Sequence, residues 1–170
     1  MKKIILGIIL LVSNSLMSQN LSLEQVLSLQ KKDLIGVEEY LSAKDWSLLE
    51  IEKETNETLG TVTFAYNKSS YGDKAESFLY YLYSDTRSRV SIQVHDKNKY
   101  NEYLKSVKTL GYKLIASKME EDTIDKVYQN NSTTIIISIT AKDNYGTTST
   151  VYSYFVVSND DYDYNFKEKY

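Results

Sequence analysis

The stretch Val90-Ser91-Ile92-Gln93-Val94 alternates strictly between apolar and polar side chains, which is typical of a β-strand with one buried face. It belongs to a set of four runs rich in β-branched and aromatic residues, as strands are. The runs span residues 46–52, 61–66, 77–83 and 89–94. The polar stretches between them are too short for a crossover helix, so we expect an antiparallel meander.

Helical patterns precede this meander and follow it. Residues 21–44 carry apolar side chains at near-helical spacing, and Ser22 and Gln25 have the spacing of a capping box. We expect a break at Lys31-Lys32-Asp33, with Asp33 capping a second piece. Another helix is expected over 97–110, because its apolar residues form one stripe and a glycine follows it. Four further strand-like runs then span residues 112–118, 123–128, 134–140 and 150–157.

The order of one helix and four strands therefore occurs twice. It predicts an α+β fold of two helix-plus-four-strand antiparallel units in tandem, with about eight strands and two main helices. We expect the first unit over 19–96, the second over 97–158, and a polar, mostly irregular tail over 159–170. Trp46-Ser47-Leu48-Leu49 matches Tyr112-Lys113-Leu114-Ile115, which favours an internal repeat. Two unrelated halves remain the alternative, because short aromatic-aliphatic matches arise by chance in this composition.

This element order resembles the secreted β-lactamase inhibitor proteins, in which two such units form a concave surface that grips a partner. The resemblance rests on no motif, so it implies a fold and not a function. The Pro-free composition and segments such as TLGTVTFAYNKSSYGDKAESF, residues 58–78, are also similar to a group of uncharacterised small exported proteins of Bacteroidetes. That second resemblance implies a compartment and little else.

The N-terminus has the layout of a secretory signal peptide. The basic start Met1-Lys2-Lys3 is followed by an apolar run over 4–12 and then by small and polar residues. The apolar run is about half the roughly twenty residues that a membrane span requires, so we expect cleavage and not a retained anchor. Cleavage after Ser15 and cleavage after Ser18 both fit the small-residue rule, and we take 1–18 as the signal. The mature protein is then secreted or periplasmic.

Composition excludes several classes of function. The chain has 20 Lys and Arg against 23 Asp and Glu, a net charge of −3, and this acidic balance argues against nucleic acid as a partner. It has no cysteine, so it can form neither a disulfide framework nor the acylated cysteine of a lipoprotein. His95 is the single histidine, so a typical zinc site cannot be assembled within one chain. We therefore expect no metal and no cofactor.

Three polar features are candidates for chemistry. His95 is expected to be a surface histidine, because no nucleophile in a recognisable catalytic motif accompanies it. Residues 161–165 open like a calcium loop, but Phe166 stands where the loop requires glycine and the chain ends before the twelfth position. A solvated acidic tail is the alternative interpretation. Glu120-Glu121-Asp122 is interpreted as a charged hairpin turn between two strands.

Tyrosine is the remaining signal, with 16 Tyr against 4 Phe and 1 Trp. In the strand over 77–83 both faces are apolar or aromatic, and Tyr152 and Tyr154 share one face of a later strand. If one set of rings lines an open sheet face, then Tyr81, Tyr83, Tyr152 and Tyr154 are the candidate ligand-binding residues. The alternative is that a helix, a loop or the tail covers these rings and makes them part of the core.

Together these features favour a non-enzymatic exported module that binds a protein or a glycan, with no membrane span after cleavage. A hydrolase that uses carboxylates such as Glu120 and Asp122 is one alternative. A structural envelope protein is another.

Overall fold

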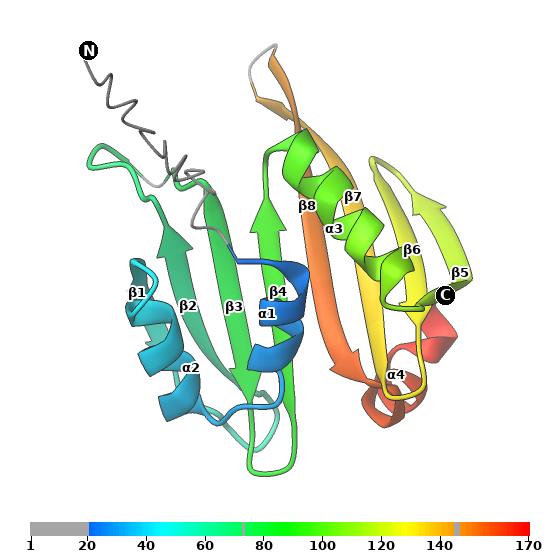
Figure 1. The fold of residues 1–170 in the computed structure, drawn as a ribbon, viewed down its shortest axis with the longest axis horizontal. Helices are drawn as coiled ribbons and strands as arrows, with labels where there is room; N and C mark the ends of the chain where they lie inside the picture. Colours follow the sequence, from blue (N-terminus) through cyan, green and yellow to red (C-terminus); the bar gives the residue numbers. More distant parts are fainter. Residues whose placement is uncertain (1–20, 73, 145–146) are drawn as a thin grey trace, which may run out of the picture.

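The computed structural model describes residues 21–72, 74–144 and 147–170, and the expected signal peptide over 1–18 lies outside these ranges. Its strands are β1 (Trp46–Glu52), β2 (Gly60–Tyr66), β3 (Ser77–Tyr83), β4 (Ser88–Val94), β5 (Lys113–Glu120), β6 (Thr123–Gln129), β7 (Thr133–Asn144) and β8 (Thr147–Ser158). They form one antiparallel sheet in the order β1-β2-β3-β4-β8-β7-β6-β5 (Figure 1). All eight runs predicted from the sequence form strands, with β7 and β8 longer than expected.

Helices cover one face of the sheet except at its two outer edges, and they cover only part of the other face (Figure 1). They are α1 (Leu23–Leu29), α2 (Leu34–Ser42), α3 (Lys97–Thr109) and α4 (Asn159–Asn165), followed by the short 3-10 helix η1 (Lys167–Lys169). The first three lie in front of the sheet in the view of Figure 1, and α4 lies behind it. The predicted start of α1 is confirmed, because Ser22 and Gln25 form a complete capping box. The predicted break is confirmed as well, and Asp33 caps α2.

The expectation of two helix-plus-four-strand units with two main helices is wrong. β4 pairs with β8 from the Val90–Val156 pair to the Val94–Tyr152 pair, so the two meanders join into one sheet. The described residues also form four α-helices in place of two. In separate units β4 and β8 would both be edge strands with unpaired backbone groups, and pairing them satisfies those groups and buries both strands.

The expectation of an irregular tail over 159–170 is also wrong. Ser158 accepts a hydrogen bond from the backbone N–H of Asp161 and thereby caps α4. Asp160 and Asp161 lie in the first turn of this helix, where negative charge is favourable. The tail is therefore a short helix that packs on the sheet.

The core lies between the sheet and α1, α2 and α3, and buried tyrosines fill much of it. Tyr103 on α3 and Tyr154 on β8 are both fully buried, and their rings meet edge to face with centroids 5.0 Å apart. The Tyr103 hydroxyl donates to the carbonyl oxygen of Leu21 at 2.6 Å, and the Tyr154 hydroxyl donates to that of Tyr100 at 2.8 Å. Burial raises the pKa of both hydroxyls far above the ordinary value. Each ring thus provides apolar contact area and has its polar group satisfied.

Candidate functional site

The four tyrosines predicted to bind a ligand lie on the face that the helices cover. Tyr81 and Tyr154 are 2% and 0% exposed, Tyr152 is 8% exposed, and Tyr83 is partly buried against the same core. The Tyr81 hydroxyl donates to the carbonyl oxygen of Lys32 in the turn between α1 and α2. The expectation that these rings line an open face is therefore wrong, and the alternative that helices cover them and make them part of the core is confirmed.

The opposite face of the central strands has a different character. Its residues alternate along each strand with the buried residues of the core, and except for the buried Ala65 of β2, which lies opposite Phe78, they are partly exposed. We call this set the open face: Thr61, Thr63, Phe78, Tyr80, Leu82, Ser91, Gln93 and Ser153. Among the described residues, no helix packs on this face of β2 and β3.

Tyr80 occupies the middle of the open face. In register it pairs with Thr63 on β2 and with Ser91 on β4, and Ser91 in turn pairs with Phe155 on β8. Partial burial raises the pKa of the Tyr80 hydroxyl, so this group stays protonated at neutral pH and can donate a hydrogen bond. Two aromatic rings and two small hydroxyl groups thus lie in one row across four strands.

α4 and the last residues of the chain close the other part of the same face. Tyr162 on α4 packs against buried residues of the three strands beyond β4, and Phe166 meets Phe155 edge to face with centroids 5.4 Å apart. The buried strand residues under Tyr162 are Val127, Ile136 and Val157. The sheet is therefore covered on both faces where Val127, Ile136 and Val157 lie, and on one face over β2 and β3.

A buried ion pair fixes α4 at this border. The guanidinium of Arg89 on β4 donates from Nε to Oδ2 of Asp161 at 2.7 Å and from a terminal nitrogen to Oδ1 at 2.8 Å. Asn165 donates to the same Oδ1 at 2.7 Å, and the guanidinium of Arg87 lies 3.6 Å from it. The Asp161 side chain is only 6% exposed, so the expectation of a solvated acidic tail is wrong at this residue.

The sequence contained a signal for this arrangement that the prediction missed. Ser158 is followed three residues later by Asp161, which is the spacing of a helix N-cap with an acidic first turn. The same aspartate also opens the pattern that resembles a calcium loop. The carboxylate is instead occupied by Arg89 and Asn165.

A cavity of about 540 Å³ lies where the open face meets α4. The loop between β1 and β2 forms one wall, and the β3–β4 hairpin and α4 form the others. Glu54, Glu57, Arg87 and Arg89 bring both signs of charge to its lining, and Leu82 of the open face reaches it. The cavity therefore extends the open face with a polar recess.

The remaining predicted features lie elsewhere. Glu120, Glu121 and Asp122 are exposed, and Glu120 ends β5 while Glu121 and Asp122 form the turn to β6, which confirms the predicted hairpin. His95 follows β4 directly, and its pKa is lowered chiefly by partial burial and then by the positive charge of Lys142. Neither feature borders the cavity.

The described ranges contain no group of three His, Asp or Glu side chains placed to hold a metal ion. Within the same ranges, no helix has both the length and the apolar character that crossing a bilayer requires. No protein-family model, no curated protein and no solved structure matches this chain, so the two resemblances noted from its sequence remain predictions.

Proposed function

We propose that the protein is an exported, non-enzymatic binding module that holds a protein partner through the open face. The observation that carries this proposal is the row of Tyr80 and its neighbours across β2, β3, β4 and β8. An uncovered sheet face is usually polar throughout, whereas this one places Phe78, Tyr80 and Leu82 of one strand among threonine and serine residues.

The shape of the surface favours a protein partner over a small sugar. Adjacent strands lie about 4.8 Å apart, so four strands offer a surface on the order of 15 Å wide. Tyrosine and arginine are enriched in protein interfaces, and Arg89 and Arg87 border the open face at the cavity. A partner that lies on the face can insert a polar group into this recess.

The position of the acidic turn gives no support to the hydrolase alternative. Glu120 and Asp122 are exposed at the β5–β6 turn. All the strands are antiparallel, and β5 begins at the end of the sheet where β4 begins, so this turn lies at the end opposite the cavity. The carboxylates and the recess are therefore separated by the length of a strand.

The proposal can be tested by capture from an envelope extract of the native host, with bound proteins identified by quantitative mass spectrometry. We expect the wild-type protein and a Tyr71→Ser control to retain the same partner, because Tyr71 lies in the β2–β3 loop and is 92% exposed. The Tyr80→Ser variant should lose it while remaining folded by circular dichroism. Equal capture of the partner by all three proteins would contradict the proposal. It would also be contradicted if the wild-type protein captured no protein and bound only glycans in a glycan-array assay.

A further inference from the structure

The eight-stranded sheet ends in two edge strands, β1 and β5. Within the described residues, no strand pairs with the outer side of either one. Both strands shift register by one residue near their starts, between Leu48 and Glu50 in β1 and between Leu114 and Ala116 in β5. Free edges are templates for pairing with another chain, and bulges and charges are the usual protection against it.

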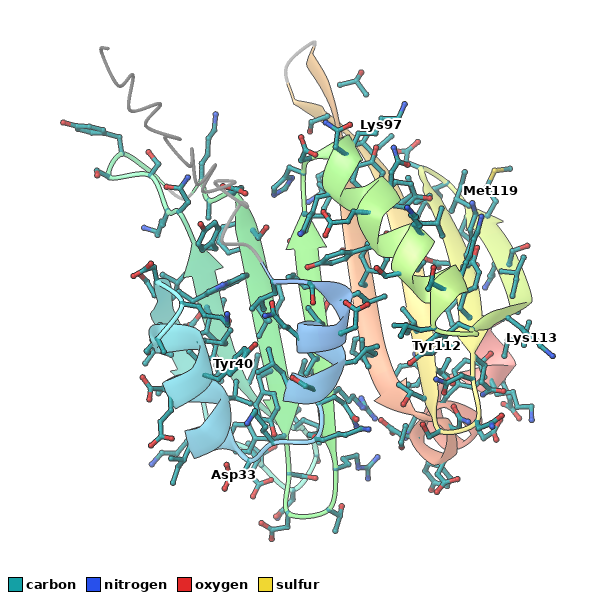
Figure 2. The ribbon with its side chains drawn as sticks, in the orientation of Figure 1. Asp33, Tyr40, Lys97, Tyr112, Lys113 and Met119 are labelled. Carbon is teal, nitrogen blue, oxygen red and sulfur yellow. The ribbon has the colours of Figure 1, made fainter. Side chains whose placement is uncertain are left out.

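The helix side of β5 is apolar and uncovered. Leu114 pairs in register with Tyr128, and Met119 pairs with Ile124, so both side chains lie on the face that carries α3. They are nevertheless 54% and 75% exposed, because α3 does not reach the outer edge (Figure 1). Figure 2 shows Met119 at the outer margin of the sheet, away from the core.

The other side of β5 is charged, and near its end Nζ of Lys118 lies 2.7 Å from Oε1 of Glu120 on the same face. Lys113 begins the strand and Glu120 ends it, and both side chains are exposed. They pair with Gln129 and Thr123 of β6, so they share the face opposite α3. The extra residue at Ile115 shifts the alternation and brings Lys113 and Glu120 onto one face.

We propose that β5 is a homodimer interface, in which β5 of one copy pairs antiparallel with β5 of a second copy about a twofold axis at Ser117. Residues directly opposite each other in an antiparallel pair share a face. In this register Leu114 lies opposite Met119 of the second copy, and Lys113 lies opposite Glu120. Ile115 stays outside the ladder, as it does in the pairing with β6.

This pairing is self-complementary. Each apolar side chain at the exposed edge meets an apolar partner on the helix side, and each lysine at a strand start meets a glutamate on the other side. The twofold symmetry repeats each contact away from the axis. Because the axis is perpendicular to the sheet, the helix sides of the two copies lie on the same side. The second copy therefore covers Leu114 and Met119 without burying an unpaired charge.

The edge strand β1 is unsuited to the same arrangement. The register that places Leu48 opposite Ile51 of a second copy, its apolar neighbour on the helix side, would bring Glu50 of the two copies together at the axis. Like charges directly opposite each other are destabilising. β1 also packs beside α2. β1 is thus protected against self-pairing, whereas β5 is complementary to itself.

Such a dimer would extend the sheet across both copies and present both open faces on the same side. It would therefore offer two equivalent surfaces to a bivalent partner. The dimer itself depends only on β5 and does not require the proposed binding function.

Sedimentation equilibrium of the purified protein tests the proposal by charge exchange. We expect a reversible monomer–dimer equilibrium that Lys113→Glu and Glu120→Lys each weaken by about tenfold, because each creates two pairs of like charges. The double variant K113E/E120K should associate more tightly than either single variant, because it rebuilds both pairs with their signs exchanged, although it also removes the Lys118–Glu120 ion pair. Glu52→Lys on β1 is the matched control and should leave the equilibrium unchanged.

Several outcomes would overturn the proposal. A protein that remains monomeric at every attainable concentration has no such interface. A dimer that is insensitive to both single variants, or that the double variant does not restore, uses another surface. Oligomers larger than a dimer that disappear in the Glu52→Lys variant would indicate that β1 of one copy pairs with β5 of another. The altered side chains are exposed, so each variant should melt at the temperature of the wild-type protein. An unchanged melting temperature shows that weaker association does not result from misfolding.

Discussion

Adjacent tyrosines in one strand show how different the two faces of this sheet are. Tyr81 is 2% exposed and donates its hydroxyl to a backbone carbonyl under α1 and α2, whereas Tyr80 lies on the open face and is partly exposed. Their residue type and strand are the same. The difference lies in what covers each face, so residue type alone does not decide which ring is core.

The same contrast occurs along the open face itself. Phe155 on β8 meets Phe166 beneath the C-terminal segment, whereas Phe78 on β3 has no helix of the described residues above it. The border between these regions is the Arg89–Asp161 ion pair. A short helix of seven residues therefore decides how much of the sheet remains open.

The largest expected effect separates the two tyrosines. Tyr81→Ser removes a buried ring and leaves a carbonyl without its donor, so we expect it to lower the free energy of unfolding by about 4 kcal/mol. Tyr80→Ser removes a partly exposed ring and should cost about 1 kcal/mol. Urea denaturation followed by circular dichroism measures both values. Equal losses would mean that the open face is as well packed as the covered face.

The next largest loss of stability is expected at the Arg89–Asp161 ion pair, which borders the open face. Asp161→Asn leaves the largely buried guanidinium of Arg89 without its charged partner, and we expect a loss of about 3 kcal/mol. Replacing both residues, as in Arg89→Met with Asp161→Leu, should cost clearly less than the sum of the two single changes, because no unpaired charge remains. A double-mutant cycle in urea measures this coupling. Additive losses would show that the ion pair does not hold α4 on the sheet.

The local parts of this fold could be predicted from the sequence because local physics determines them. Strand alternation marks the position of β4, and hydrogen-bonding side chains at Ser22 and Asp33 mark the starts of α1 and α2. The pairing of β4 with β8 could not be predicted in the same way. It joins residues 58 to 66 positions apart, from the Val94–Tyr152 pair to the Val90–Val156 pair, and no local pattern in either strand identifies its partner.

The candidate site was harder to predict for a related reason. β3 carries aromatic or apolar residues on both faces, so a period of two identifies the two sets but not the one that the helices cover. The prediction chose Tyr81 and Tyr83, and the open face carries Phe78 and Tyr80. Recognition of Ser158 as a helix cap would have predicted α4, but its contact with Arg89 depends on the whole sheet.

A smaller effect is expected at a close contact on the covered face. A Cβ atom at Gly60 would lie 2.5 Å from Cζ of Tyr83 and 2.9 Å from the backbone nitrogen of Glu54, so Gly60→Ala must change its distance to both of them. We expect a loss of about 2 kcal/mol by urea denaturation, because overpacking forces neighbours to shift. The neighbouring Thr61→Ala, on the open face, is the control and should change stability by less than about 0.5 kcal/mol. A harmless Gly60→Ala would show that Tyr83 adjusts freely.

The smallest effect is a pH dependence at the end of β4. The pKa of His95 is lowered by partial burial and by Lys142, so the folded protein binds a proton there less readily than the unfolded chain does. The resulting stability is fully present above the unfolded value of about 6.5, and it is lost as the pH falls through the lower pKa of the folded state. Because the groups are largely solvated, we expect a contribution below about 0.5 kcal/mol.

Titration of the His95 ring protons by NMR measures this pKa directly. Lys142→Gln removes the second of the two causes, so the His95 midpoint should move upward while remaining below that of an unstructured peptide. Lys68→Gln removes a lysine of the β2–β3 loop that does not contribute to the lowered pKa of His95, and it should leave the midpoint unchanged. If Lys142→Gln leaves the midpoint unchanged, the positive charge of Lys142 does not affect the pKa of His95. Partial burial of the ring would then be the whole cause of the shift.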